Sequence, residues 1–300
     1  MDLNPTTTLV DLGRCPNDEG DGLCPNLIRE WLGEWGRLSL WSTRMARELR
    51  VRIRGKGATS GIGAETARVM AKRGVRVIIP ARDLKKAGEM KERIQKESPK
   101  AEVIVLEIDL SSFASIKRFC SEFLSLGLPL HILINNAGKF SHKLEFSEDK
   151  IEMSFATNYL GHFLLTELLI EKMVETAAQT GIQGRIINVS SVIHSWVKRD
   201  GFRFNQMLNP KNYNGTRAYA QSKLANILHA KELARQLKGA STTCYVGLSR
   251  KTEGVSGKYY ADCNECSCSS MANDESEAHN LWRQSRALIH RRLRLPAAAA

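Results

Sequence analysis

Between Gly57 and about Lys238, short apolar runs rich in β-branched residues alternate with longer stretches of helical periodicity. The runs are VRVIIPA (75–81), VIVLEIDL (103–110), LHILINNAG (130–138) and GRIINVSS (184–191). Each run is apolar along nearly its whole length, which is typical of strands covered on both faces. The alternation therefore predicts an α/β fold with a doubly wound parallel sheet, in a domain over residues 57–262.

A glycine-rich stretch, GATSGIG (57–63), stands directly before the first of these helices. Glycines there would let the backbone approach a pyrophosphate, and the helix that follows would direct its free N–H groups at the same anion. An ordinary glycine turn is the alternative, but the ordered strands and helices downstream favour a nucleotide site in a Rossmann-like domain. The expected contacts with the cofactor are Gly57, Ser60, Gly61, Ile62 and Gly63.

The residue after the second strand bears on which cofactor binds. Arg82 stands where the adenine ribose is expected, and a positive side chain there accommodates the extra phosphate of NADP(H). Asp83 is either a competing carboxylate that would favour NAD or the cap of the next helix. Asp109 ends the third strand, where it would accept a hydrogen bond from the adenine amine or else cap the helix that begins at SSFAS.

A second group of residues suggests proton transfer. YAQSK places Tyr219 and Lys223 four apart on one helix face, and a lysine beside a phenol lowers the pKa of that phenol. Tyr219 could then exchange a proton with a carbonyl or alcohol oxygen, and Ser191, after the strand RIINVS, could hydrogen-bond the same oxygen. Asn158, in a helical stretch that disfavours asparagine, could hold a relay water. A solvated Tyr–Lys pair and a turn-capping serine are the alternatives.

In this order, GATSGIG, NNAG (135–138), NYLG, NVSS and YAQSK resemble the short-chain dehydrogenase/reductase family over residues 57 to about 238. The likeness is greatest to its retinol-dehydrogenase-like branch, and within it to the chloroplast members associated with the Tic import complex. The resemblance implies an NADP-dependent carbonyl or alcohol oxidoreductase at the chloroplast inner envelope, with import-complex subunits as partners. It implies four catalytic residues, Asn158, Ser191, Tyr219 and Lys223. It also implies a cofactor cleft lined by Asn135, Ala137, Gly138, Tyr219 and Lys223.

Two junctions depart from the family pattern. The stretch LRVRIRGKG puts Arg50, Arg52 and Arg54 on one face of the expected first strand, and burying unpaired guanidinium groups is costly. Residues 1–56 are therefore expected to be an atypical, disordered leader. After Lys238 the chain passes directly to GASTTCY, without a further strand or a Pro-Gly turn, which indicates a deletion near 238/239. The sheet is thus predicted to be incomplete at its first and sixth strands.

Two other functions remain open beside the oxidoreductase, and the second of them rests on these junctions. One is an NADPH-sensing regulatory subunit of a plastid import complex, and the other is an inactive splice product. A Tyr219→Phe change would abolish catalysis but leave a sensing role intact.

The composition of residues 263–300 predicts a polar and basic tail. Cys263, Cys266 and Cys268 fall short of a tetrahedral zinc site, so no metal is expected. Residues 279–296 combine apolar side chains, including Trp282 and Ile289, with arginines, which would suit calmodulin or an anionic membrane surface; a solvated basic helix is the alternative. The net charge of +12 is compatible with peripheral membrane contact. No aromatic–basic recognition pattern points to nucleic acid.

Overall fold

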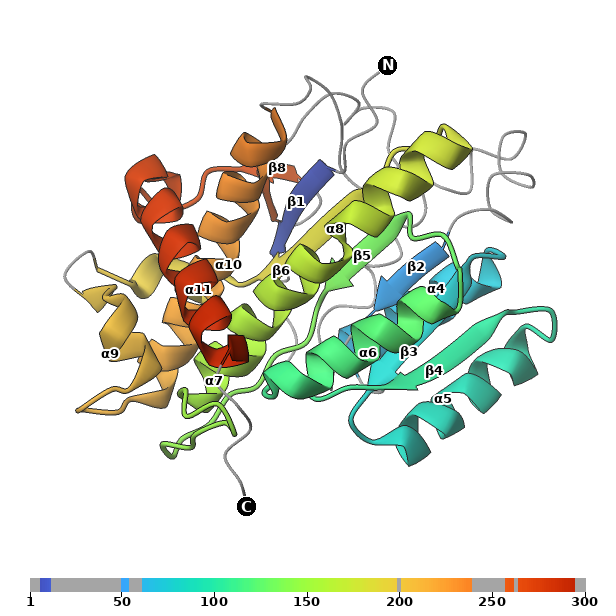
Figure 1. Cartoon of the computed structure of the whole chain (residues 1–300), viewed down its shortest axis with the longest axis horizontal. Coiled ribbons are helices and arrows are strands. Elements are labelled where there is room, and N and C mark those ends of the chain that lie inside the picture. Colours follow the sequence, from blue (N-terminus) through green and yellow to red (C-terminus); the bar gives the residue numbers. More distant parts are fainter. Residues whose placement is uncertain are drawn as a thin grey trace.

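The apolar runs of the sequence form strands of one sheet in the computed structural model, which describes residues 6–11, 50–53, 61–198, 201–238, 257–261 and 264–294 (Figure 1). The strands are β1 (Thr6–Asp11), β2 (Arg50–Ile53), β3 (Arg76–Ala81), β4 (Val103–Glu107), β5 (Ile132–Asn135), β6 (Arg185–Ser190), β7 (Tyr259–Ala261) and β8 (Asn264–Cys266). Their order in the sheet is β4-β3-β2-β5-β6-β1-β7-β8, and every neighbouring pair is parallel except β7 with β8. The predicted doubly wound parallel sheet is confirmed.

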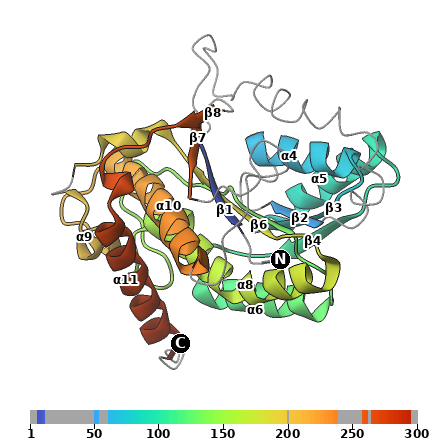
Figure 2. The same cartoon turned by 90° about the horizontal axis from the view of Figure 1, so that it is seen from above.

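Helices cover both faces of this sheet. They are α4 (Gly61–Lys72), α5 (Leu84–Glu97), α6 (Phe113–Ser125), α7 (Met153–Phe155), the π-helical η2 (Ala156–Leu160), α8 (Gly161–Thr180), the 3-10 helix η3 (Val192–Trp196), α9 (Phe204–Leu208), α10 (Gly215–Lys238), the 3-10 helix η6 (Met271–Asn273) and α11 (Glu275–Arg294). Figure 2 shows α4 and α5 on one side of the sheet and α6 and α8 on the other.

Alternate residues along each strand pack into two separate hydrophobic cores, one on each face of the sheet. In β3, Val77 and Ile79 pack with the residues of α4 and α5, whereas Ile78 packs into the core formed by α6, α8, α10 and α11. In β6, Ile187 and Ile186 divide in the same way. This division is what a period of two along a strand requires when both faces are covered, and it explains why the runs are apolar throughout.

At the first-strand and sixth-strand positions, where the sequence predicts an incomplete sheet, the domain over residues 57–262 supplies no described strand, and segments of the first 56 residues lie there instead. β2 lies between β3 and β5, and β1 lies between β6 and β7. The leader was expected to lack regular structure, so these ten residues depart from that expectation. Ladder pairing is made by backbone N–H and C=O groups, so a segment remote in sequence can supply it, and TTTLVD has the β-branched residues that suit a strand. The predicted deletion near 238/239 borders residues 239–256, which lie outside the described residues.

The expectation of a polar tail over residues 263–300 also needs correction, because α11 packs on the domain. Trp282 is buried, with its ring 4.8 Å from that of Phe163 and 5.5 Å from that of His229. The hydroxyls of Ser285 and Tyr159 lie 2.9 Å apart in the core. Amphipathic periodicity accounts for this placement, because it gives α11 one apolar face to bury and one arginine-rich face to solvate. None of the described helices has the length and apolar character needed to cross a membrane.

Candidate active site

Helix α10 carries Tyr219 and Lys223 one turn apart, and the lysine is not solvated. Its side chain is only 3% exposed, its Nζ donates a hydrogen bond to Val189 O at 3.2 Å, and the same Nζ lies 5.5 Å from the centre of the Tyr219 ring. A buried ammonium group must be compensated by acceptors, because its desolvation is costly. The carbonyl at the end of β6 supplies one such acceptor, so strand and helix together hold the cation beside the phenol ring.

The two serines at the end of β6 have different surroundings. Ser190 Oγ donates to Lys223 O at 2.9 Å, so that hydroxyl already joins β6 to α10. Ser191 is partly exposed, and its side chain makes no capping hydrogen bond to η3. It caps that helix through its backbone instead, since its carbonyl oxygen lies 2.8 Å from His194 Nδ1 and accepts from His194 N at 3.1 Å. The side chain of Ser191 thus does not act as the turn cap that was its alternative role.

Asn158 lies in the middle of the π-helical turn η2 and is fully buried. Its Oδ1 accepts from Lys139 N at 2.6 Å, and its Nδ2 donates to Lys139 O at 2.9 Å and to Ser222 Oγ at 3.0 Å. These bonds tie the loop after β5 to α10. Single π-helical turns occur frequently at functional sites, and this one explains how an asparagine fits a helical stretch that disfavours it.

The loop NNAG (135–138) brings its backbone to the same place. A Cβ added to Gly138 would lie 3.7 Å from Lys223 Nζ and 3.9 Å from Asn158 Oδ1. Ala137 is buried beside it. Asn135, also buried, donates through Nδ2 to Thr166 Oγ1 at 3.1 Å and to Asn188 Oδ1 at 2.7 Å, so its amide braces β5 against α8 and β6. Residues from four separate elements therefore converge near the carboxyl ends of β5 and β6.

The candidate cofactor residues lie along the same edge of the sheet. Arg82 Nη1 is 3.8 Å from Asp109 Oδ2, and the arginine side chain is 61% exposed. Asp83 caps α5 by accepting from Lys86 N, which accounts for this second carboxylate. Asp109 does not cap α6, since Ser112 does so, but it accepts from the backbone N–H and the hydroxyl of Ser111.

At the start of α4 the described residues begin with Gly61, Ile62 and Gly63, while Gly57 and Ser60 lie outside them. The first turn of α4 carries no acidic residue. A helix N-terminus without a carboxylate, followed at the next strand end by an exposed guanidinium group, fits an anionic dinucleotide.

Three contributors to this arrangement are not among the residues predicted from sequence. Asn226 donates to the same Val189 O as Lys223, at 3.0 Å, and Ser222 holds Asn158. The ring of Phe140 lies edge-on to Tyr219, with centroids 5.9 Å apart. Helical spacing from Lys223 could have singled out Asn226, since residues three apart share a face. No local pattern marks Phe140.

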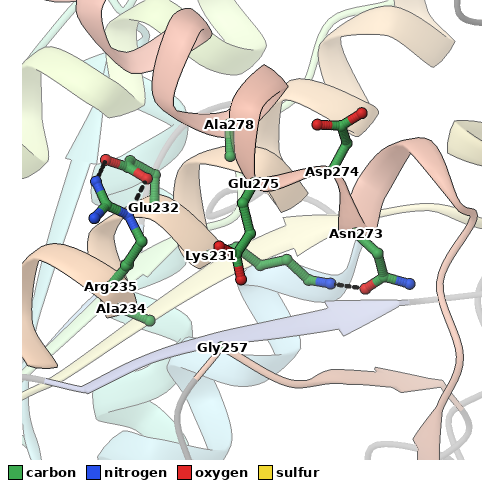
Figure 3. Close-up of a pocket in the computed structure, with 9 residues that line it drawn as sticks. All are labelled: Lys231, Glu232, Ala234, Arg235, Gly257, Asn273, Asp274, Glu275 and Ala278. Carbon is green, nitrogen blue, oxygen red and sulfur yellow. Dashed lines mark hydrogen bonds and ion pairs between the residues drawn. The ribbon is translucent and has the colours of Figure 1, made fainter.

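A cavity of about 250 Å³ lies elsewhere, between the C-terminal half of α10 and the start of α11 (Figure 3). Burial alone would raise the pKa of Glu232 in its wall, but hydrogen bonds from Arg235, His279 and Gln236 lower it to about 2. Lys231, also in the wall, bonds Asn273. The cavity contains none of the predicted site residues, and Glu232 in its wall is already paired with Arg235.

Comparisons with known proteins show the family of this chain. A family model described as short chain dehydrogenase matches residues 56–199. The short-chain dehydrogenase TIC 32 B, chloroplastic, of Brassica napus is 41% identical over 270 aligned positions, which cover 75% of this chain and 84% of the relative. Because 75% of 300 residues is fewer than 270, part of the relative has no counterpart in this chain. Human retinol dehydrogenase 11 is 35% identical, with 75% and 81% covered.

Among solved structures, an uncharacterised protein from Mycobacterium paratuberculosis matches with a TM-score of 0.65 and 27% identity, covering 81% of this chain and 94% of that one. The NADP complex of RhlG from Pseudomonas aeruginosa matches with a TM-score of 0.50 and 24% identity, covering 64% and 68%. At that identity the second likeness speaks for the fold alone.

Proposed function

The chain belongs to the short-chain dehydrogenase family of oxidoreductases, and we propose that it transfers hydride between NADP(H) and a carbonyl or alcohol, with Tyr219 as the acid and base. The observation that carries the proposal is the convergence of Tyr219, Lys223, Asn158 and Gly138 at one edge of the sheet. Structural bonds account for Ser190 and Asn135, whereas burying the ammonium group of Lys223 beside a partly exposed tyrosine is costly and is typical of a functional site. Proton transfer by Tyr219, assisted by Lys223, accounts for this arrangement.

Each residue has a role that follows from its surroundings. NADPH, when bound, supplies the hydride. Tyr219 gives its hydroxyl proton to the carbonyl oxygen during reduction and takes a proton from the alcohol during oxidation. The buried ammonium of Lys223 favours the phenolate form electrostatically, and Ser191, whose side chain is not used as a cap, donates to the substrate oxygen. Asn158 positions the loop after β5, because its amide bonds both Lys139 and Ser222.

The preference for NADP(H) rests on Arg82. Its guanidinium group is exposed at the end of β3, and the neighbouring Asp83 is engaged in capping α5. The cofactor phosphates would meet the N-terminus of α4, with Gly61 and Gly63 at its first turn. Ala137 and Gly138 would border the cleft on the other side of Lys223.

A Tyr219→Phe variant tests the proposal. NADPH oxidation with small aldehydes and quinones should fall by about 100-fold or more, because the proton donor is lost, while NADPH binding measured by fluorescence titration stays unchanged. Tyr213→Phe is the matched control, since the Tyr213 hydroxyl donates to Ser141 O at 2.9 Å and to Glu152 Oε1 at 3.3 Å and meets none of the proposed catalytic residues, and it should keep most of the turnover. A Tyr219→Phe protein that turns over like the parent chain would refute the assignment of the acid and base.

A regulatory role in the chloroplast is the second candidate, favoured by the relative named TIC 32 and by the segments of that relative that have no counterpart here. We place the protein in the chloroplast, peripheral to the inner envelope, where import-complex subunits would be its partners. An NADPH-sensing subunit would bind those partners equally well as the Tyr219→Phe variant. Calmodulin binding through residues 279–296 would require α11 to leave the domain, because Trp282 and Ile289 are buried.

A further inference from the structure

Large apolar side chains are exposed on two segments next to the candidate active site. Trp196 in η3 is 69% exposed and Val192 is 55% exposed, the two highest values among the large hydrophobic side chains of the described residues. On the loop after β5, Phe140 and Phe146 are 42% and 43% exposed. Soluble proteins seldom leave a tryptophan so open to water unless something covers it.

These segments are connected through α10 into one surface. η3 packs against α10, and Phe140 meets the ring of Tyr219 on the same helix. The loop is also joined to the start of α10, because Tyr213 donates to Ser141 O at 2.9 Å. We call residues 140–146, 192–198 and 203–217 the docking surface.

The charge of the docking surface is mainly positive. Asp200 is the only acidic residue in the sequence from 176 to 231. On the loop, the exposed Glu145 is paired with Lys139. Lys143 on the loop is an exposed cation, and four more exposed cations on the surface form no ion pair with a described residue: Lys198, Arg203, Lys211 and Arg217. Arg68 on α4, by contrast, is neutralised by Glu65 and Glu97.

We propose that the docking surface binds the surface of an anionic lipid bilayer, with Trp196 and Val192 in the headgroup region and the four cations at the lipid phosphates. Tryptophan prefers that region because its ring is amphipathic, and uncompensated lysine and arginine beside apolar side chains are typical of peripheral attachment. A protein partner would need acids and apolar pockets arranged to match, whereas a bilayer needs only the excess of positive charge found here. Docking would bring Tyr219, whose ring meets Phe140 of this surface, close to the membrane.

Vesicle co-sedimentation of the whole chain tests the proposal without depending on catalysis. Vesicles of phosphatidylcholine with phosphatidylglycerol should bind the protein, and vesicles of phosphatidylcholine alone should bind it at least tenfold more weakly. The Arg203→Gln/Lys211→Gln double variant should lose about fivefold in affinity for each charge removed. Trp196→Ser/Val192→Ser should lose about tenfold or more.

Matched controls lie on other faces of the molecule. Leu124→Ser/Leu126→Ser removes side chains that are 42% and 41% exposed at the end of α6, and Lys96→Gln/Lys100→Gln removes two exposed cations around the end of α5. Both should bind within twofold of the parent chain. Unchanged NADPH titration and thermal unfolding would show that each variant is folded. The proposal is overturned if the Trp196/Val192 variant binds like the parent, if a control loses as much, or if neutral vesicles bind equally.

Discussion

Replacing Gly161 by alanine should destabilise the protein, whereas the same replacement at Gly88 should stabilise it. A Cβ at Gly161 would lie 2.3 Å from Leu110 O, and contacts under 3.0 Å are essentially never seen. A backbone oxygen cannot rotate away, so α8 would have to move off the loop before α6. Overpacking of this kind lowers the free energy of unfolding by about 1–3 kcal/mol, occasionally more. The higher helix propensity of alanine raises it by only about 1 kcal/mol. A contact as short as 2.3 Å belongs at the upper end of the range for overpacking, so we expect a net loss of about 2 kcal/mol.

Gly88 lies inside α5, and a Cβ there would meet nothing within 4 Å. The replacement then acts only through the backbone, because alanine loses less conformational entropy than glycine in a helix. Gly88→Ala should therefore raise the free energy of unfolding by about 0.5–1 kcal/mol. For a domain of this size, about 2 kcal/mol corresponds to a fall in Tm of roughly 4–8 °C, and the Gly88 variant should unfold about 1–4 °C higher.

Thermal unfolding followed by circular dichroism at one scan rate measures both variants against the parent chain. Gly161 directly follows η2, so the displacement should also loosen the Asn158 bonds to Lys139 and Ser222, and turnover should fall with stability. A Gly161→Ala protein as stable as the parent would show that α8 and Leu110 do not approach as closely as the structure has them.

Three further predictions concern the cofactor, pH and α11. Arg82→Glu should lower the affinity for NADPH relative to NADH by tenfold or more, measured by titration with both cofactors. Burial lowers the pKa of His131 to about 4 and of His229 to about 3. Below pH 6.5 both histidines become protonated in the unfolded protein but stay neutral in the folded protein, so the free energy of unfolding should be highest above pH 6.5 and should fall as the pH drops toward 4. Urea unfolding at pH 7 and pH 5 measures this difference. His229→Leu should make the free energy of unfolding depend less on pH. Trp282→Ala should cost about 3 kcal/mol in urea unfolding, because its ring packs on Phe163 in the core.

The candidate site could be predicted from sequence because its signals are local. Tyr219 and Lys223 share a helix face by spacing alone, and parallel strands bring Asn135 and Ser191 to one edge once the strands are recognised. The family resemblance inferred from those motifs is confirmed by the comparisons. What spacing could not show is burial: only packing makes Lys223 a buried cation beside the Tyr219 ring.

The sequence by itself determined the alternation of strands and helices, the glycine loop and the order of the catalytic motifs, because side-chain periodicity and spacing act over a few residues. Tertiary structure alone decided that Thr6–Asp11 pairs between β6 and β7, and that Arg50–Ile53 lies inside the sheet despite its arginines. It also decided that the amphipathic helix α11 turns its apolar face into the core. Such choices depend on which backbone groups and apolar surfaces remain without partners once the rest of the chain has folded, and no local stretch of sequence records them.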